Sequence, residues 1–217
     1  MASHAEQMDA IYRWQRPIYD LTRKYYLFGR DGLIDRLPLA EGGSVLEIGC
    51  GTGRNLALIR RRWPNACLFG LDISVEMLRA AHSKLGDRAR LAAGDACGFD
   101  PDSLFGQTAF DCVLFSYTLS MIPDWRGAMS HALETLGEGG SLYAVDFGAC
   151  EGLPDWARSG LWRWLRHFHV TPRLDLADYA RELAREKGFV CTVTSGALGY
   201  FRHIHLERPR FGKLYPS

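Results

Sequence analysis

The sequence predicts an α/β fold: a doubly wound, mostly parallel sheet of seven strands with an antiparallel end and an N-terminal helical cap. Short apolar runs alternate with amphipathic, helix-like segments, which is the pattern of parallel strands joined by crossover helices. The first of these runs leads straight into a glycine-rich turn. In folds of this kind, ligands bind where such turns meet the carboxyl edge of the sheet.

The elements are predicted in the following order. Ile11–Leu37 has a helical pattern, and Pro17 starts or kinks a helix there. The seven expected strands, in chain order, are Val45–Ile48, Leu68–Leu71, Arg90–Ala93, Phe110–Phe115, Ser141–Asp146, Val190–Thr194 and Ile204–Glu207. The later helices are expected at Asn55–Arg62, Val75–Leu85, Trp125–Leu136, Pro154–Phe168 and Leu176–Lys187, with Ser74 as the N-cap of the second.

Length and composition favour one domain over residues 1–217, with a cap (1–40), a core (41–150), a helical insertion (151–175) and a closing helix and strands (176–217). The hydrophobic content of 47% and the charged content of 24% are ordinary for globular proteins. A net charge of +1 argues against a nucleic-acid partner bound through a broad basic face.

The sequence shows no apolar run of about 18 residues that would span a bilayer, and its polar start is not typical of a signal peptide. Six scattered cysteines without zinc-ligand spacing predict reduced core thiols and no metal site. We therefore expect a cytoplasmic protein.

The most specific signal is Val45–Gly53, V-L-E-I-G-C-G-T-G, a strand followed by a G-x-G-x-G turn and then a helix. Glycines let the backbone turn sharply and approach a ligand closely. The rival dinucleotide fingerprint needs a small residue at position 54, where this chain has Arg54. The segment resembles motif I of class I S-adenosylmethionine-dependent methyltransferases, which have a Rossmann-like fold. Glu47, two residues before the first glycine, fits that motif.

The resemblance implies S-adenosylmethionine as the cofactor. Asp72 ends the second strand, where a carboxylate can accept both ribose hydroxyls; the alternative is a helix cap, a role that Ser74 fills better. Asp95 is expected to accept from the adenine amine, or else to form an Asx turn. Glu47 is expected to orient the methionine amine rather than act as a base. The predicted cofactor-binding residues are Tyr19, Arg23, Arg30, Glu47, Gly49, Cys50, Gly51, Thr52, Gly53, Asn55, Asp72, Ile73, Met77, Gly94, Asp95, Ala96 and Ser116.

The segment Ser116–Pro123 lacks the Asp/Asn-Pro-Pro-aromatic tetrad of enzymes that methylate base amines, which also argues against DNA or RNA substrates. Together with the aromatic and basic stretch Ile11–Asp31 and the segment Gly199–His205, it resembles the bacterial betaine-lipid synthesis N-methyltransferases. These enzymes convert diacylglyceryl-homoserine to its trimethylated form in three N-methylations. The resemblance implies a lipid acceptor, peripheral membrane contact and, as functional partner, the enzyme that makes diacylglyceryl-homoserine.

The resemblance also suggests roles near the acceptor. The predicted catalytic residues are Tyr19, Tyr117 and His203, and the predicted substrate-binding residues are Tyr25, Tyr26, Tyr117 and Arg202. A carboxylate-bearing headgroup favours an arginine, whereas tyrosine rings attract a trimethylammonium group. Simple core packing stays an alternative for Tyr117, and a structural role stays one for His203.

Pro154–Phe168 is expected to dock on lipid, with Trp162 beside Arg158 and Arg166 at the headgroup level. The alternative is an ordinary amphipathic helix whose Trp162 packs on a neighbour. Two other functions stay open: methylation of a soluble small molecule (an amine, a hydroxyl or a quinone), and a cofactor-binding protein without turnover.

Overall fold

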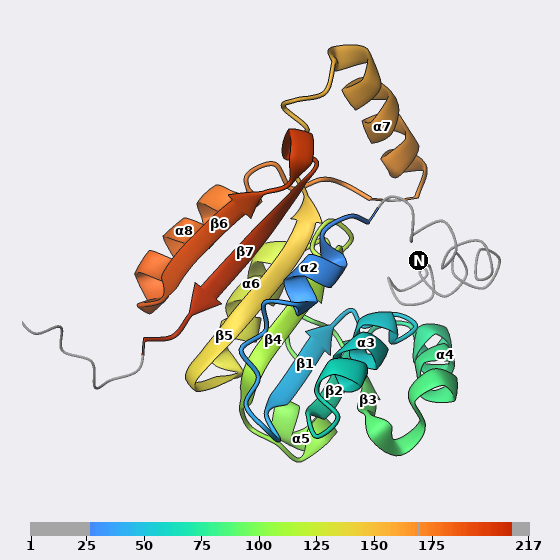
Figure 1. Cartoon of the computed structure of the whole chain (residues 1–217), viewed down its shortest axis with the longest axis vertical. Helices are drawn as coiled ribbons and strands as arrows, with labels where there is room; N and C mark the ends of the chain where they lie inside the picture. Colours follow the sequence, from blue (N-terminus) through green and yellow to red (C-terminus); the bar gives the residue numbers. More distant parts are fainter. Residues whose placement is uncertain (1–26, 169, 210–217) are drawn as a thin grey trace, which may run out of the picture.

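A computed structural model describes residues 27–168 and 170–209. It contains a seven-stranded sheet in the order β3-β2-β1-β4-β5-β7-β6 (Figure 1). The first five strands of that order are parallel, and β7 pairs antiparallel with both β5 and β6. The strands are β1 (Ser44–Ile48), β2 (Cys67–Asp72), β3 (Arg90–Ala93), β4 (Phe110–Ser116), β5 (Leu136–Phe147), β6 (Val190–Ser195) and β7 (Phe201–Glu207). The predicted α/β fold, a mostly parallel seven-stranded sheet with an antiparallel end, is confirmed.

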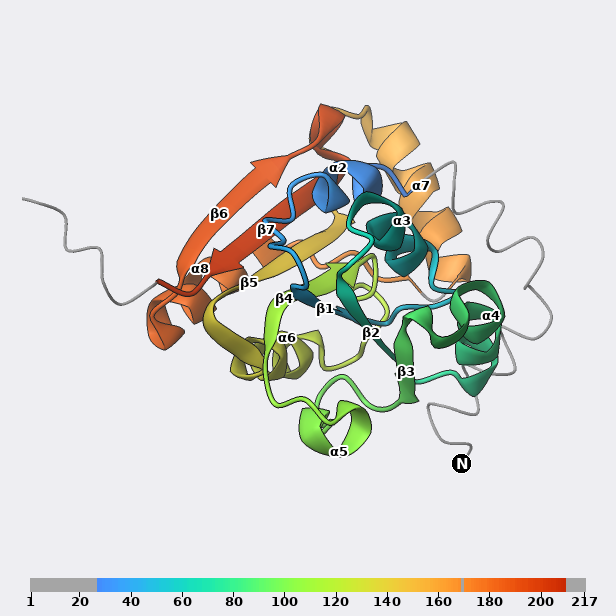
Figure 2. The ribbon, with the colours of Figure 1, turned by 60° about the horizontal axis from the view of Figure 1, so that its bottom comes forward.

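Helices cover both faces of the twisted sheet (Figure 2). On one face lie α2 (Arg30–Ile34), α3 (Arg54–Arg62) and α4 (Val75–Leu85), and on the other lie α5 (Pro101–Phe105), α6 (Trp125–Glu134) and α8 (Leu176–Lys187). Because successive strand residues point to opposite faces, β1 contributes Val45 to one apolar cluster and Leu46 to the other. All five residues of β1 are buried, as expected for a central parallel strand.

Three elements differ from the prediction. Gly29 adopts φ +81°, in the left-handed region, so α2 begins only at Arg30, and it ends at Ile34; a helix continuing to Leu37 is therefore wrong. The part of the predicted helix before residue 27 lies outside the described residues. Strand β5 begins at Leu136 rather than Ser141, because a register irregularity between Phe110 and Cys112 of β4 accommodates Gly139, at φ +68°, within the strand. The short helix α5 was missed, although Asp100 caps it and Pro101 opens it.

Helix α7 (Asp155–His167) lies beyond the carboxyl ends of β4 and β5 (Figure 1). Its apolar face packs on the protein: Leu165 is buried, and Leu161 and Phe168 contact the same cluster. Trp162 also packs there, with the Arg158 guanidinium 5.8 Å from its ring centre. The expectation of Trp162 as an exposed lipid anchor is therefore wrong, because its side chain packs against the apolar cluster of the protein. The outward face instead exposes Trp156, at 81% of its full accessible area.

The described helices include none that is both long and apolar enough to cross a bilayer. The same residues bring together no group of three or more His, Cys, Asp or Glu side chains suited to a metal ion. All six cysteines are free thiols, and Cys50, Cys112 and Cys150 are buried.

Candidate functional site

Two adjoining cavities open at the carboxyl ends of β1, β2 and β4. The main cavity has a volume of about 290 Å³ and the side cavity about 380 Å³. Gly49, Gly51 and Ser116 line both, so the two cavities meet at the glycine turn. A ligand that spans both cavities would pass directly over this turn.

The three glycines of the turn all have positive φ, but they serve different purposes. A Cβ on Gly49 would lie 2.1 Å from Thr118 Cγ2, and one on Gly53 would lie 2.8 Å from Leu85 Cδ1. These two glycines permit close packing, and Gly53 lines neither cavity. A Cβ on Gly51, at φ +53°, would meet no protein atom within 4 Å. The space above Gly51 belongs to the cavities and not to the protein core.

Asp72 ends β2 in the wall of the main cavity, and only 9% of it is exposed. Its Oδ2 accepts a hydrogen bond from Gly51 N (2.7 Å), and its Oδ1 accepts one from Ser74 N (2.9 Å). Ser74 is the N-cap of α4, as expected, because its hydroxyl accepts from Met77 N. Asp72 therefore holds the glycine turn, while each carboxylate oxygen has further acceptor capacity.

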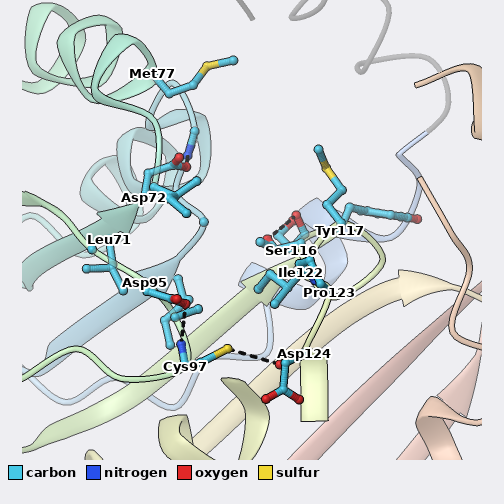
Figure 3. Close-up of a pocket in the computed structure, with 18 residues that line it drawn as sticks. Leu71, Asp72, Met77, Asp95, Cys97, Ser116, Tyr117, Ile122, Pro123 and Asp124 are labelled. Carbon is cyan, nitrogen blue, oxygen red and sulfur yellow. Dashed lines mark hydrogen bonds between the residues drawn. The ribbon is translucent and has the colours of Figure 1, made fainter. Parts of the chain in front are cut away.

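Asp95 follows β3 and lies in the same wall as Asp72 (Figure 3). Its Oδ1 accepts from Cys97 N at 2.9 Å, so the Asx-type turn left open by the sequence is present. The Cys97 thiol lies 3.3 Å from Asp124 O, and burial raises the pKa of this thiol to about 11. Asp95 can form this turn and still face the cavity, so the two expectations for it are compatible.

Glu47 is the buried acid of the side cavity, with 2% of its surface exposed. Its Oε1 accepts from Asn55 Nδ2 at 2.7 Å, whereas its buried Oε2 has no hydrogen-bond partner among the described residues. Burial raises the pKa of this carboxyl to about 8, and the bond from Asn55 opposes the shift. A buried acceptor without a partner is costly, so a donor from a ligand would stabilise Glu47.

Ser116 Oγ is likewise buried and has no partner in the described part of the chain. Three cations also line the side cavity: Arg30, Arg54 and Lys84. Arg54 forms an ion pair with Asp31 at 2.8 Å, and Arg30 Nε donates to Leu27 O. A buried carboxylate oxygen close to these cations suits a zwitterion that carries an ammonium and a carboxylate.

Residues 117–123, the β4 loop, form the opposite wall of the main cavity (Figure 3). Tyr117 has φ +58°, and its ring packs edge-on against Phe147 at 4.7 Å between centroids. Its hydroxyl donates to Phe28 O at 2.6 Å, and burial strongly raises its pKa. Tyr117 thus lines the cavity and also packs in the core. Its hydroxyl donates to a backbone carbonyl, so the catalytic role expected of Tyr117 is corrected to a role in lining the cavity and packing the core.

His203 and Arg202 lie in neither cavity. His203 Nε2 lies 2.9 Å from Gly29 O, and its Nδ1 lies 3.3 Å from an Arg36 nitrogen. Burial lowers its pKa. Arg202 forms an ion pair with Glu151. The catalytic role expected of His203 and the acceptor role expected of Arg202 are corrected to structural roles, because both side chains are bonded elsewhere.

The structure brings most of the other predicted residues to the two cavities. Ile73, Met77, Gly94 and Ala96 line the main cavity, and Cys50, Thr52 and Asn55 line the side cavity. Tyr19, Arg23, Tyr25 and Tyr26 lie outside the described residues. Sequence reasoning missed the following lining residues: Leu27, Ile48, Arg54, Leu71, Lys84, Cys97, Thr118, Met121, Ile122, Pro123 and Asp124. The lining residues of the segment 117–123 could have been predicted, because they directly follow the predicted strand Phe110–Phe115. No feature of the sequence indicates that Lys84 lies at the site.

Curated proteins and solved structures resemble this chain. A trans-aconitate 2-methyltransferase of Afipia carboxidovorans is 34% identical over 51% of this chain and 41% of its own length. The chain spans less than half the length of this relative and of a trans-aconitate 2-methyltransferase of Escherichia coli O157:H7. A complex of a methyltransferase with its activator from Haloferax volcanii superposes with a TM-score of 0.75 at 18% identity, covering 93% of this chain and 99% of that one.

A phosphoethanolamine N-methyltransferase of Haemonchus contortus, solved with S-adenosylmethionine, superposes with a TM-score of 0.65 at 17% identity. It covers 83% of this chain, and this chain covers 52% of it. At such identities the structures show the fold alone. The profile of the methyltransferase domain family matches residues 19–194, which is most of the chain. Together with the glycine turn, Asp72 and the buried Glu47, that match shows that the chain belongs to this family and is an S-adenosylmethionine-dependent methyltransferase.

Proposed function

We propose that this methyltransferase acts on the amine of a lipid headgroup, that of diacylglyceryl-homoserine, in three successive steps. The observation that supports this proposal best is the charge of the main cavity. Its charged lining residues, among those described, are three aspartates, Asp72, Asp95 and Asp124, with no Arg, Lys or His. We assign Asp72 and Asp95 to the cofactor, which leaves Asp124, directly after the loop that follows β4, on the acceptor side. In N-methylation a positive charge moves from sulfur to nitrogen, and a nearby negative field stabilises that charge throughout.

The cofactor roles follow from the geometry of the two cavities. When bound, S-adenosylmethionine supplies a methyl group that its sulfonium makes electrophilic. We propose that Asp72 accepts from the ribose, that Asp95 faces the adenine, and that Glu47 Oε2 accepts from the methionine amine. Arg30, in the same side cavity as Glu47, suits the methionine carboxylate.

No described side chain is placed to act as a strong base, and the reaction does not require one. An α-amino group has a pKa of about 8, so its deprotonation at pH 7 costs roughly 1.4 kcal/mol. Water that enters with the acceptor can take this proton. The chain's main contribution is to hold the amine in line behind the methyl group, which is worth several kcal/mol.

The names of the curated relatives favour a second candidate, methylation of a carboxylate such as that of trans-aconitate. A polycarboxylate acceptor calls for several cations and the homoserine carboxylate for one, and the described wall of the main cavity offers none to either. The two candidates differ in the group that is methylated: an amine, which becomes positively charged, or a carboxylate, which loses its charge.

A substrate panel distinguishes these candidates. The purified chain is incubated with methyl-labelled cofactor and, in separate reactions, with diacylglyceryl-homoserine vesicles, free homoserine and trans-aconitate, and products are identified by mass. We expect the lipid to gain one, two and three methyl groups. Label on trans-aconitate, or on free homoserine but not on the lipid, would overturn the lipid proposal.

Replacing Asp72 with alanine should weaken cofactor binding by roughly 1.5–3 kcal/mol, the range for hydrogen bonds to a charged group. Calorimetric titration of the cofactor measures this change. Ser74→Ala is the control: it removes the cap of α4, at about 1 kcal/mol of stability, while Asp72 stays in place. A loss below about 0.5 kcal/mol in Asp72→Ala would show that Asp72 only supports the turn.

A lipid acceptor also requires contact with a bilayer, and we propose that the outward face of α7 provides it. Trp156 is exposed there, and the exposed Arg163 and Arg166 form no ion pair with a described residue. Each arginine near an anionic surface contributes about 1 kcal/mol. Arg163→Gln combined with Arg166→Gln should thus weaken binding to anionic vesicles more than tenfold, and Trp156→Ser should weaken it further.

Co-sedimentation with anionic and neutral vesicles at two salt concentrations measures this binding. The charge-matched control is Arg60→Gln with Arg61→Gln on α3, which should leave vesicle binding unchanged. Equal binding of wild type to both lipids at both salt concentrations would contradict docking through α7.

A further inference from the structure

The β4 loop carries five residues of the main cavity wall: Tyr117, Thr118, Met121, Ile122 and Pro123. It belongs to no helix or strand, so the sheet ladder does not fix most of its backbone. Groups from other parts of the chain hold it instead. Two of these groups carry opposite charges, and they lie outside the lining of both cavities.

The first is Asp146, near the carboxyl end of β5, which is completely buried. Its Oδ2 accepts from Ser120 N at 2.9 Å, and its Oδ1 accepts from Phe147 N at 2.8 Å. Burial raises the pKa of this carboxyl to about 6, while these two bonds and the charge of Arg173 act in the opposite direction. At neutral pH the protein therefore keeps a buried carboxylate behind the loop.

The second is Arg173, in the segment that connects α7 to α8. Its Nε donates to Leu119 O at 3.2 Å, and its Nη2 donates to Ile122 O at 2.8 Å. Its neighbour Thr171 adds a bond from its backbone N–H to Ser120 O at 2.9 Å. The backbone of Leu119, Ser120 and Ile122 is thus hydrogen-bonded to two distant parts of the chain: the end of β5, through Asp146, and the segment 171–173.

A buried charge is an expensive way to stabilise a fold, because desolvation offsets much of the attraction. Charge-assisted hydrogen bonds are, however, shorter and stronger than neutral ones, so they fix the position of a loop more tightly. A displacement of about 1 Å in the acceptor relative to the methyl group can lower the rate by about 10²-fold.

We propose that Asp146 and Arg173 are positioning residues, which hold the β4 loop so that the acceptor lies in line with the methyl donor. They touch neither the cofactor nor the acceptor. The inference rests on methyl transfer at this site and not on the lipid nature of the acceptor. Its test can therefore use whichever acceptor the panel identifies, and one of its measurements needs no acceptor.

The test compares Arg173→Gln and Asp146→Asn with wild type. Asn keeps the shape of Asp146 and an oxygen acceptor but removes its charge. Arg126→Gln is the matched control, because the Arg126 side chain forms an ion pair with Asp175 close to Arg173 but no hydrogen bond or ion pair with residues 117–123 in the described structure. Arg173→Lys serves as a milder second variant if Arg173→Gln does not fold, since lysine keeps the charge but cannot reproduce the two-pronged contact.

We expect kcat/KM for the acceptor to fall at least tenfold in Arg173→Gln and in Asp146→Asn, while the cofactor Kd stays within twofold of wild type. Without any acceptor, hydrogen exchange of residues 117–123 should be faster in both variants and unchanged in Arg126→Gln. Asp146→Asn should be less stable than wild type, because its NH2 group would face one of the two backbone donors, Ser120 N or Phe147 N, that the carboxylate accepts from.

Three results would overturn the proposal: acceptor kinetics within threefold of wild type, a parallel loss of cofactor affinity, or exchange in the β4 loop that matches wild type. If the lipid is not methylated but the exchange result holds, the lipid proposal fails and the positioning role stands.

Discussion

Replacing Gly51 with valine is expected to abolish S-adenosylmethionine binding while the protein stays folded. Gly51 lines both cavities, and a Cβ added there would meet no protein atom within 4 Å. The valine side chain would therefore fill the passage between the cavities without clashing with the core. At φ +53° a non-glycine residue costs about 1–2 kcal/mol, which lowers stability but does not unfold a domain of this size.

Gly42 provides the matched control for this variant. It is exposed, has φ +73°, and a Cβ there would also meet nothing within 4 Å, but it lies in the turn before β1, away from both cavities. Gly42→Val should lose a similar amount of stability and keep full cofactor affinity. Calorimetry for binding and thermal unfolding for stability separate the two effects. A folded Gly51→Val protein with wild-type affinity would mean that the cofactor does not cross this turn.

The sequence predicted the sheet and the cofactor end of the site better than the acceptor end, for a physical reason. Strands such as β1 and helices such as α4 are specified by local patterns of apolar residues and caps. The glycine turn and Asp72 could be placed because each follows directly from a strand end. Their positions depend only on the strand that they follow, and a strand can be recognised from a short stretch of sequence.

Roles that depend on contacts between distant segments could not be read in this way. His203 was expected to be catalytic because histidines titrate near neutral pH, yet Gly29, 174 residues away, binds its ring. Trp162 was expected to be an exposed anchor, but helical spacing alone cannot show which face meets the core. Nothing in the sequence pattern singles out Asp146 and Arg173, because their contacts with the β4 loop join segments that are distant along the chain.

The affinity for S-adenosylmethionine should rise with pH between about 6 and 8 and then fall, because the cofactor's own ammonium, with a pKa of about 8, loses its proton above that pH. In the cofactor-free protein the Glu47 carboxyl has a pKa of about 8, mainly because it is buried. A bound methionine ammonium beside Oε2 would favour the carboxylate, so below pH 8 binding must release a proton. The association constant then increases by up to about tenfold per pH unit. Glu47→Gln should bind more weakly at pH 8 and lose this increase.

The stability of the cofactor-free protein should depend on pH in the opposite sense. Because the folded-state pKa of Glu47 lies above its ordinary value near 4.5, the native state binds more protons than the unfolded state. The stabilising contribution is fully present below about pH 4.5 and is lost as the pH rises through about 8. Glu47→Gln should remove this decline and gain about 4 kcal/mol at pH 8 relative to wild type, because the pKa rises from 4.5 to about 8 at about 1.4 kcal/mol per unit.

Urea unfolding at pH 5, 6, 7 and 8 measures this difference, and the exposed Glu41→Gln is the matched control. Asp146 also has a raised pKa, but it is present in both proteins, so the difference between wild type and Glu47→Gln isolates Glu47. If Glu47→Gln binds the cofactor less tightly but is more stable in its absence, then Glu47 contributes to cofactor binding at a cost in stability. Parallel pH profiles for wild type and Glu47→Gln, in binding and in stability, would contradict that role.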